Sequence, residues 1–271
     1  MDVFQAIVLG LVQGATEFLP ISSSGHLALF SALFRWDPPT LAFAVALHMG
    51  TLLAVVIYYI GDVWKLILAV VNTFKKRERL DHQDQFYVRL LWMLLVALIP
   101  AGTVGLLFAD EIGGTLSEPH LVSIFLFVTA FLLVAASWDS GRGLETIDKV
   151  SLKHALSVGF LQILALFPGV SRSGSTIAGG IFAGLTREDS ARFSFLLSIP
   201  TLTAAGLLES KDALTASVSH VSLVVVFCGF ITAFIVGFLS IRFFFATIKR
   251  TKFYYFAAYC VLVGIVGLVF T

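Results

Sequence analysis

The sequence is short of charge and of cysteine, and both shortages restrict the class of protein. Only 13% of its 271 residues are charged, about half the share of a soluble domain. Its two cysteines, Cys228 and Cys260, lie inside apolar stretches, which argues against a disulfide framework or a cysteine metal site. No basic residue precedes the first apolar stretch, so the start does not read as a cleaved signal peptide. A chain with this composition is typical of a protein embedded in a membrane.

Uncharged apolar runs predict six membrane-spanning helices. About 20 apolar residues cross the hydrocarbon core, and five charge-free runs reach or approach that length. A sixth, shorter run contains Pro200, which we expect to kink it. The six runs are 41–60, 90–109, 121–137, 193–208, 221–241 and 253–270. The sequence therefore predicts an all-α polytopic membrane protein made of a single membrane domain, residues 1–271.

The distribution of Lys and Arg predicts the orientation of these spans. Cations gather in the segments 61–80, 138–153, 187–192 and 249–252, whereas 110–119 has none and 209–220 has only Lys211. Short loops rich in Lys and Arg stay in the cytoplasm. We therefore expect both termini on the opposite side, the periplasm, of a bacterial cytoplasmic (inner) membrane.

Two more apolar stretches, 3–33 and 154–185, are each interrupted in the middle by Ser, Gly and Pro. Each arm has about 10 to 14 residues and rises about 15 to 21 Å as a helix, which is half a bilayer. Irregular backbone at that depth is tolerated only where protein or a water-filled cavity surrounds it. Each stretch is thus predicted to be a re-entrant helical hairpin.

The two hairpins also resemble each other in sequence. At a shift of 149 residues the identical pairs are Gly10/Gly159, Gln13/Gln162, Phe18/Phe167, Ser22/Ser171, Ser24/Ser173 and Gly25/Gly174. Repeat one (1–138) and repeat two (150–271) are then each one hairpin followed by three spans. Because three is odd, the second repeat is upside down relative to the first. The prediction is an inverted-topology repeat whose hairpin tips meet near the midplane of the membrane, as in some transporters.

The tips carry residues that are costly inside a membrane and are therefore functional candidates. Glu17 and His26 belong to the first tip and Arg172 to the second. In both tips a Ser/Gly run opens into a helix, whose free N–H groups attract anions, and Arg grips phosphate oxygens in pairs. The predicted phosphate-binding residues are Ser22, Ser24, Gly25, Ser171, Ser173, Gly174, Ser175 and Thr176.

A carboxylate repels phosphate, so Glu17 needs a further explanation. A divalent cation held between Glu17 and phosphate oxygens resolves the conflict, and Gln13, four residues earlier on the same helix face, can add an oxygen ligand. His26 is a candidate general acid or nucleophile, and Ser23 is a rival nucleophile. His48, alone in the first span, is interpreted as a hydrogen-bonded structural residue.

The tip sequences resemble two signature motifs of the undecaprenyl-diphosphate phosphatase family, which is also known for bacitracin resistance. The matching segments are 13–26, Gln-Gly-Ala-Thr-Glu-Phe-Leu-Pro-Ile-Ser-Ser-Ser-Gly-His, and 168–176, Pro-Gly-Val-Ser-Arg-Ser-Gly-Ser-Thr. The resemblance implies removal of the terminal phosphate of undecaprenyl diphosphate, which recycles the lipid carrier for cell-wall synthesis. It also implies a divalent cation, Mg²⁺ or Ca²⁺, and catalytic roles for Glu17, His26, Arg172 and, in one version, Ser23. Gln13 stands where other members have Glu.

Several alternatives stay open on the sequence alone. A transporter or flippase of a prenyl phosphate is the rival function, because broken helices in inverted repeats are a transporter architecture. The nucleophile is His26, Ser23 or water. The expected partners are a prenyl diphosphate lipid and the bilayer, without nucleic acid, and a homo-oligomer is left open.

Overall fold

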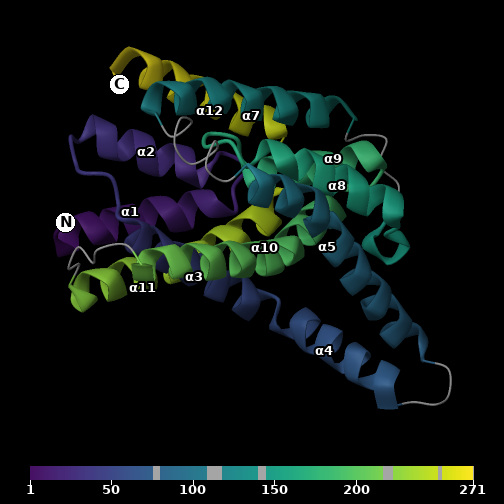
Figure 1. Ribbon diagram of the computed structural model, residues 1–271. Coiled ribbons are helices and arrows are strands. Elements are labelled where there is room, and N and C mark those ends of the chain that lie inside the picture. The colour runs from purple at the N-terminus through teal and green to yellow at the C-terminus, as the bar shows by residue number, and fades with distance from the viewer. Residues whose placement is uncertain (76–79, 109–117, 140–144, 216–221, 250–251, 271) are drawn as a thin grey trace.

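The computed structural model describes residues 1–75, 80–108, 118–139, 145–215, 222–249 and 252–270, and these are almost entirely helical (Figure 1). The helices are α1 Val3–Glu17, α2 Ser23–Leu33, α3 Leu41–Tyr58, α4 Ile60–Lys75, α5 His82–Leu107, α7 Pro119–Asp139, α8 Leu152–Leu164, α9 Arg172–Ala183, α10 Arg187–Thr215, α11 Leu223–Thr247 and α12 Phe253–Phe270, with a short 3₁₀ turn at Ile147–Lys149. Six of them, α3, α5, α7, α10, α11 and α12, are long and apolar enough to cross a membrane. The predicted all-α polytopic membrane protein is confirmed.

Helix α4 was not predicted from the sequence. It follows α3 almost without a break, in a stretch whose cations were read only as an orientation signal. Its apolar residues are largely exposed, as Trp64 and Phe74 illustrate. A search for charge-free runs finds helices that are apolar on all sides. It does not find a helix such as α4, in which charged and apolar residues are interspersed along the sequence.

Helix α10 is longer than its charge-free run, because its first turn carries the acidic residues Glu188 and Asp189. Acidic residues are favourable at a helix N-terminus. Pro200 lies inside this continuous helix, as membrane helices allow where neighbouring groups satisfy the freed carbonyl.

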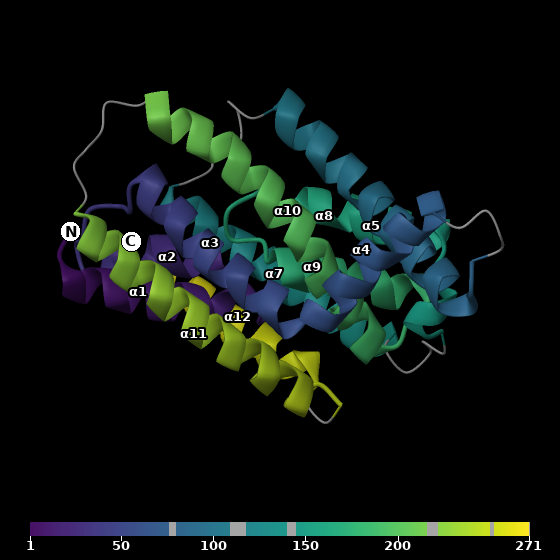
Figure 2. The ribbon, with the colours of Figure 1, turned by 90° about the horizontal axis from the view of Figure 1, so that it is seen from below.

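Each predicted hairpin is a pair of helices joined by a tight turn, α1–α2 in the first and α8–α9 in the second. The first helix of each hairpin packs against a helix of the other half of the chain, α1 against α11 and α8 against α5. Figures 1 and 2 show α1 running alongside α11 in both views. The depth of the hairpins in a membrane and the inverted relation of the two repeats stay predictions.

Two glycines that pair in the sequence repeat allow this close packing. A Cβ atom on Gly10 would lie 2.7 Å from the carbonyl oxygen of Gly229 in α11, and one on Gly159 would lie 2.7 Å from that of Ala97 in α5. Helix interfaces in membranes favour small residues because they let backbones approach. The same position of each hairpin thus allows the same kind of close helix–helix contact.

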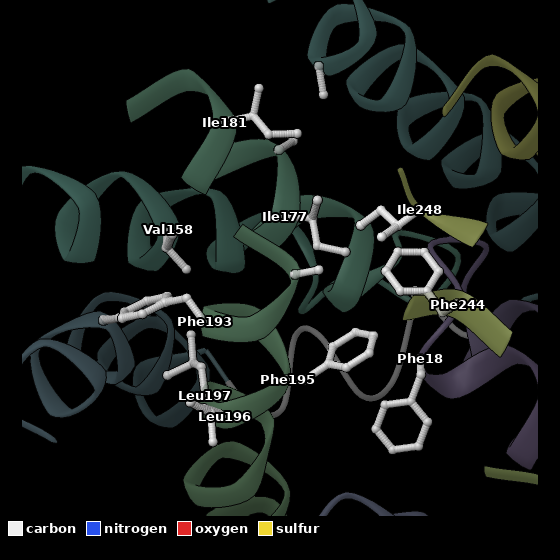
Figure 3. Packing of buried hydrophobic residues seen from close by; sticks show 14 of the residues in the cluster. Phe18, Val158, Ile177, Ile181, Phe193, Phe195, Leu196, Leu197, Phe244 and Ile248 are labelled. Carbon is white, nitrogen blue, oxygen red and sulfur yellow. The ribbon is translucent and has the colours of Figure 1, made fainter. Parts of the chain in front are cut away.

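An aromatic cluster holds the end of α1 in place beside the first tip. Phe18 is fully buried, and its ring lies 5.4 Å from that of Phe195 in α10, which in turn lies 5.5 Å from Phe244 in α11. Figure 3 shows these three rings next to one another. Because Phe18 directly follows Glu17, the cluster fixes the direction in which that carboxylate leaves the helix.

Candidate functional site

The two hairpin tips contact each other. The Arg172 guanidinium lies 2.5 Å from a carboxylate oxygen of Glu17, and the Ser173 hydroxyl donates to the Leu19 carbonyl at 3.0 Å. The structure therefore brings together the acidic and basic residues that the sequence placed 155 positions apart.

Both tips are built on the same serine cap. The Ser22 hydroxyl accepts from the Gly25 N–H at the start of α2, and the Ser171 hydroxyl accepts from the Gly174 N–H at the start of α9. Such a cap satisfies one of the free N–H groups of a helix terminus. The two cap serines differ in backbone conformation, because Ser22 has a φ of +71° and Ser171 one of −70°, and a positive φ is rare for a residue with a side chain.

Glu17 is the centre of the hydrogen-bond network. One carboxylate oxygen pairs with Arg172, and the other accepts from the Gln13 amide at 2.8 Å and from the Ser23 hydroxyl at 2.6 Å. Arg172 Nη1 is buried and has no partner among the residues the structure describes. The arrangement joins a hydroxyl to a base that other groups orient, which is the geometry of an activated nucleophile, with one guanidinium nitrogen left for a ligand.

A cavity of about 260 Å³ opens beside this network. Its polar wall contains Glu17 and Arg172 together with hydroxyl groups from both tips. The lining residues are Glu17, Ser22, Ser23, Ser24, His48, Ala165, Leu166, Pro168, Val170, Ser171, Arg172, Thr201, Leu202 and Glu209. A guanidinium, several hydroxyls and the start of helix α2 on one wall suit an anion such as phosphate.

The remaining predicted phosphate-binding residues are buried in the tips and do not line this cavity. Gly25 and Gly174 are packed beside the caps, and the Thr176 hydroxyl lies 2.6 Å from that of Ser194. Ser173 and Ser175 are also buried. These residues shape the tips from within.

His26 faces away from the cavity. Its Nδ1 lies 2.7 Å from the Ser22 carbonyl oxygen and its Nε2 lies 2.9 Å from the Tyr259 hydroxyl of α12. A separate cavity of about 160 Å³, lined by α2 and α12, is next to its ring. Because a carbonyl oxygen only accepts, Nδ1 is the protonated nitrogen. His26 therefore holds the backbone at the unusual Ser22 conformation.

An apolar groove of about 460 Å³ continues from the polar cavity. Both share Ala165, Leu166, Arg172, Thr201 and Glu209 in their walls. The rest of the groove is lined mainly by small and apolar residues of α5, α8 and α10. Figure 2 shows the C-terminal parts of α5 and α10 diverging from each other. A polar pocket joined to an apolar groove suits a ligand with a charged head and a hydrocarbon tail.

The donor set for a divalent cation is small. Within the described part of the chain, no three His, Cys, Asp or Glu residues are grouped to hold a metal. Glu17 is the carboxylate in the tips, and the Gln13 amide oxygen beside it is buried without a partner among the described residues. These residues fit a cation that takes most of its ligands from phosphate oxygens and water, as Mg²⁺ commonly does.

Two ionisable residues of the cavity wall, His48 and Glu209, are not among the functional residues predicted from the sequence. His48 had a detectable signal, because an ionisable residue in a span is a functional candidate, yet it was interpreted as structural. Glu209 directly follows the apolar run 193–208. Nothing in the sequence distinguishes it from an ordinary loop residue.

This chain is similar to known proteins over nearly its whole length. A family model described as "Bacitracin resistance protein BacA" matches residues 6–266. Relatives named "Undecaprenyl-diphosphatase" include those of Chloroherpeton thalassium, 41% identical over 98% of this chain and 95% of the relative, and Methanosphaera stadtmanae, 42% identical over 99% and 98%. A third, from Moorella thermoacetica, is 41% identical over 97% and 96%. The chain belongs to the bacitracin resistance protein BacA family.

Proposed function

We propose that this protein removes the terminal phosphate from undecaprenyl diphosphate and releases undecaprenyl phosphate. One observation carries the proposal. In the wall of a polar cavity, Ser23 and Arg172 each hydrogen-bond to a different oxygen of the Glu17 carboxylate. Family membership and the name shared by the relatives support the same reaction. Transport needs no nucleophile, so the Ser23 to Glu17 hydrogen bond favours hydrolysis over a flippase.

In this proposal Ser23 is the nucleophile and Glu17 is its base. The Ser23 oxygen attacks the terminal phosphorus, its proton passes to Glu17, and the bridging oxygen leaves with the prenyl monophosphate. Water then cleaves the phosphoserine. Arg172 stabilises the charge that develops on the phosphate oxygens, and its free Nη1 supports that role.

The proposal gives His26 a positioning role. Its ring nitrogens are engaged by Ser22 and Tyr259, on the side of α2 that faces the smaller cavity. The orientation supports Ser23 over His26 as the nucleophile. We expect loss of His26 to weaken catalysis through the Ser22 turn.

A divalent cation, Mg²⁺ or Ca²⁺, belongs to the proposal as a group bound together with the substrate. Glu17 and the Gln13 amide oxygen would hold it on the protein side. When bound, it would neutralise charge on the diphosphate. Arg172 orients the substrate, and the proton moves from Ser23 to Glu17.

The lipid chain is proposed to lie in the apolar groove. The groove and the polar cavity meet at Arg172, so a diphosphate at Arg172 directs its chain between α5, α8 and α10. A volume of about 460 Å³ is in the range of small-molecule pockets. It therefore holds the first part of a long prenyl chain and leaves the rest in the bilayer.

We further propose that the site opens toward the periplasm of a bacterial cytoplasmic membrane. The groove is lined by the C-terminal parts of α5 and α10. The loops that follow these helices are the cation-poor ones, which the positive-inside rule assigns to the outer side. On the same rule both termini lie in the periplasm.

The test is release of phosphate from undecaprenyl diphosphate by the purified protein in detergent, with Mg²⁺, with Ca²⁺ and with a chelator. We expect Arg172→Ala to lower the rate by about 100- to 1,000-fold, the usual effect of removing a group that stabilises transition-state charge. Wild-type protein that releases no more phosphate than Arg172→Ala would overturn the proposal. Equal rates with and without chelator would remove the cation from it.

A further inference from the structure

His48 and Glu209 are the two ionisable residues lining the cavity that the proposed mechanism does not use. His48 lies in the middle of span α3, is half-buried, and lines the same cavity as Glu17, Ser23 and Arg172. Its imidazole is close enough to the Glu17 carboxylate for an electrostatic interaction between them. Placing a histidine inside a membrane span costs free energy, so such a residue is usually functional or paired with another polar group.

The hydrogen bonds of His48 leave one ring nitrogen available. Nδ1 donates to the Ala44 carbonyl of the preceding turn at 3.0 Å, which fixes the ring orientation and places the proton on Nδ1, because a carbonyl oxygen only accepts. Within the residues that the structure describes, no hydrogen bond engages Nε2. A backbone carbonyl that holds one nitrogen of a histidine while the other meets a ligand is a recurring arrangement in functional sites.

The matching span of the second half carries a different group at the position of His48. At the shift of 150 residues that pairs Thr51 with Thr201, the counterpart of His48 is Ser198. Ser198 is fully buried and its hydroxyl donates to the Phe195 carbonyl of its own helix. The repeat-related span thus packs with a small residue that bonds only its own backbone.

We propose that His48 is a substrate-contacting residue, whose Nε2 hydrogen-bonds to a phosphate oxygen of the bound prenyl diphosphate. The inference rests on the proposed function. Nε2 donates to a phosphate oxygen when the ring carries a second proton, and it accepts from a phosphate hydroxyl when the ring does not. Together, His48 on α3 and Arg172 on α9 then contact the diphosphate from two walls of the cavity.

The experiment compares His48→Leu, which removes the hydrogen bond at similar volume, with His48→Gln, which keeps a hydrogen-bonding group at similar reach. Two quantities are measured in detergent: kcat and KM for phosphate release from undecaprenyl diphosphate, and the Kd of a prenyl methylenediphosphonate, which binds without being cleaved. His120→Leu, at an exposed histidine of α7, is the matched control. Thermal unfolding of each variant checks that it is folded.

We expect His48→Leu to raise the Kd and lower kcat/KM by about 10- to 100-fold, as for the loss of one hydrogen bond to a charged group. The Kd and kcat/KM of His48→Gln should stay within about tenfold of the wild-type values, and those of His120→Leu should equal the wild-type values. The inference is overturned if His48→Leu binds the analogue as tightly as wild type, or if Leu and Gln weaken binding equally. A wild-type protein that binds the analogue but releases no phosphate would instead contradict the proposed function.

Discussion

The two hairpin tips share a frame and differ in the groups that the frame presents. Both begin their second helix with a serine cap closed on a glycine N–H, and both use a glycine in their first helix to approach another span. At the shift of 149 residues, however, Glu17 pairs with Leu166, Ser23 with Arg172 and His26 with Ser175. The glycines and cap serines that build the frame repeat, whereas Glu17, Ser23 and Arg172, which are proposed for chemistry, do not. Gln13, proposed as a cation ligand, is the exception, because it pairs with Gln162.

This difference shows how two tips with the same frame can form one polar site. Ser23 and Arg172 occupy the same position of their helices and meet on either side of Glu17. Two identical tips would set two hydroxyls or two cations against each other. Opposite chemistry at equivalent positions instead places the proposed nucleophile on one side and the proposed phosphate-binding cation on the other.

The largest expected effect comes from neutralising the acid that the first tip carries and the second lacks. Glu17→Gln removes the proposed base and leaves the partly buried Arg172 guanidinium without its counter-charge, so phosphate release should fall by about 1,000-fold or more. The rate of phosphate release in detergent measures it. Glu188→Gln, an exposed acid paired with Lys249, is the control. A Glu17→Gln variant within tenfold of wild type would show that the tips do not differ in the way proposed.

The next effect separates the two candidate nucleophiles of the first tip. Ser23→Ala should lower the rate by about 100- to 1,000-fold, whereas His26→Gln should lower it by roughly tenfold through the Ser22 turn. Acid quenching during turnover identifies the phosphorylated residue, since phosphoserine survives acid and phosphohistidine does not. Recovery of phosphohistidine would exclude Ser23 as nucleophile, and recovery of neither would favour direct attack by water.

A smaller effect tests the shared frame. Gly10→Ala and Gly159→Ala each place a methyl group against a carbonyl oxygen of the neighbouring span, so each should lower the free energy of unfolding by about 1 to 3 kcal/mol. Gly61→Ala, where a Cβ meets nothing within 4 Å, is the matched control and should be neutral or stabilising. Thermal unfolding in detergent compares the three. If only one of the two hairpin variants is destabilised, the frame is not shared.

The smallest effect tests the backbone difference between the two cap serines. Ser22→Gly loses a cap hydroxyl but relieves a φ of +71°, whereas Ser171→Gly loses the same cap at an ordinary φ of −70°. Glycine adopts positive φ without cost, so Ser22→Gly should be more stable than Ser171→Gly by about 0.5 to 1 kcal/mol. The same unfolding measurement reports it, and equal stabilities would mean that Ser22 is not strained.

Much of the fold was predictable because hydropathy reports it directly. Six spans and two broken hairpins follow from apolar runs and their Ser/Gly/Pro interruptions, and the Glu17 to Arg172 contact follows from the repeat. The direction of a side chain does not follow in this way. His26 and His48 are both single histidines in apolar helices, yet the first bonds to Tyr259 and the second lines the cavity. Which face of a helix meets which neighbour is decided by packing between distant segments, and composition does not record it.

The pairing of α1 with α11 also constrains how the chain is made. Helix α1 is the first helix of the sequence, and α11, the helix with which it makes its most extensive contact, begins at Leu223. The first hairpin therefore waits for most of the chain to be synthesised and inserted before it gains its main contact. Because Glu17 lies at the end of α1, we expect the carboxylate proposed as the base to be among the earliest residues translated and among the last to be set in place.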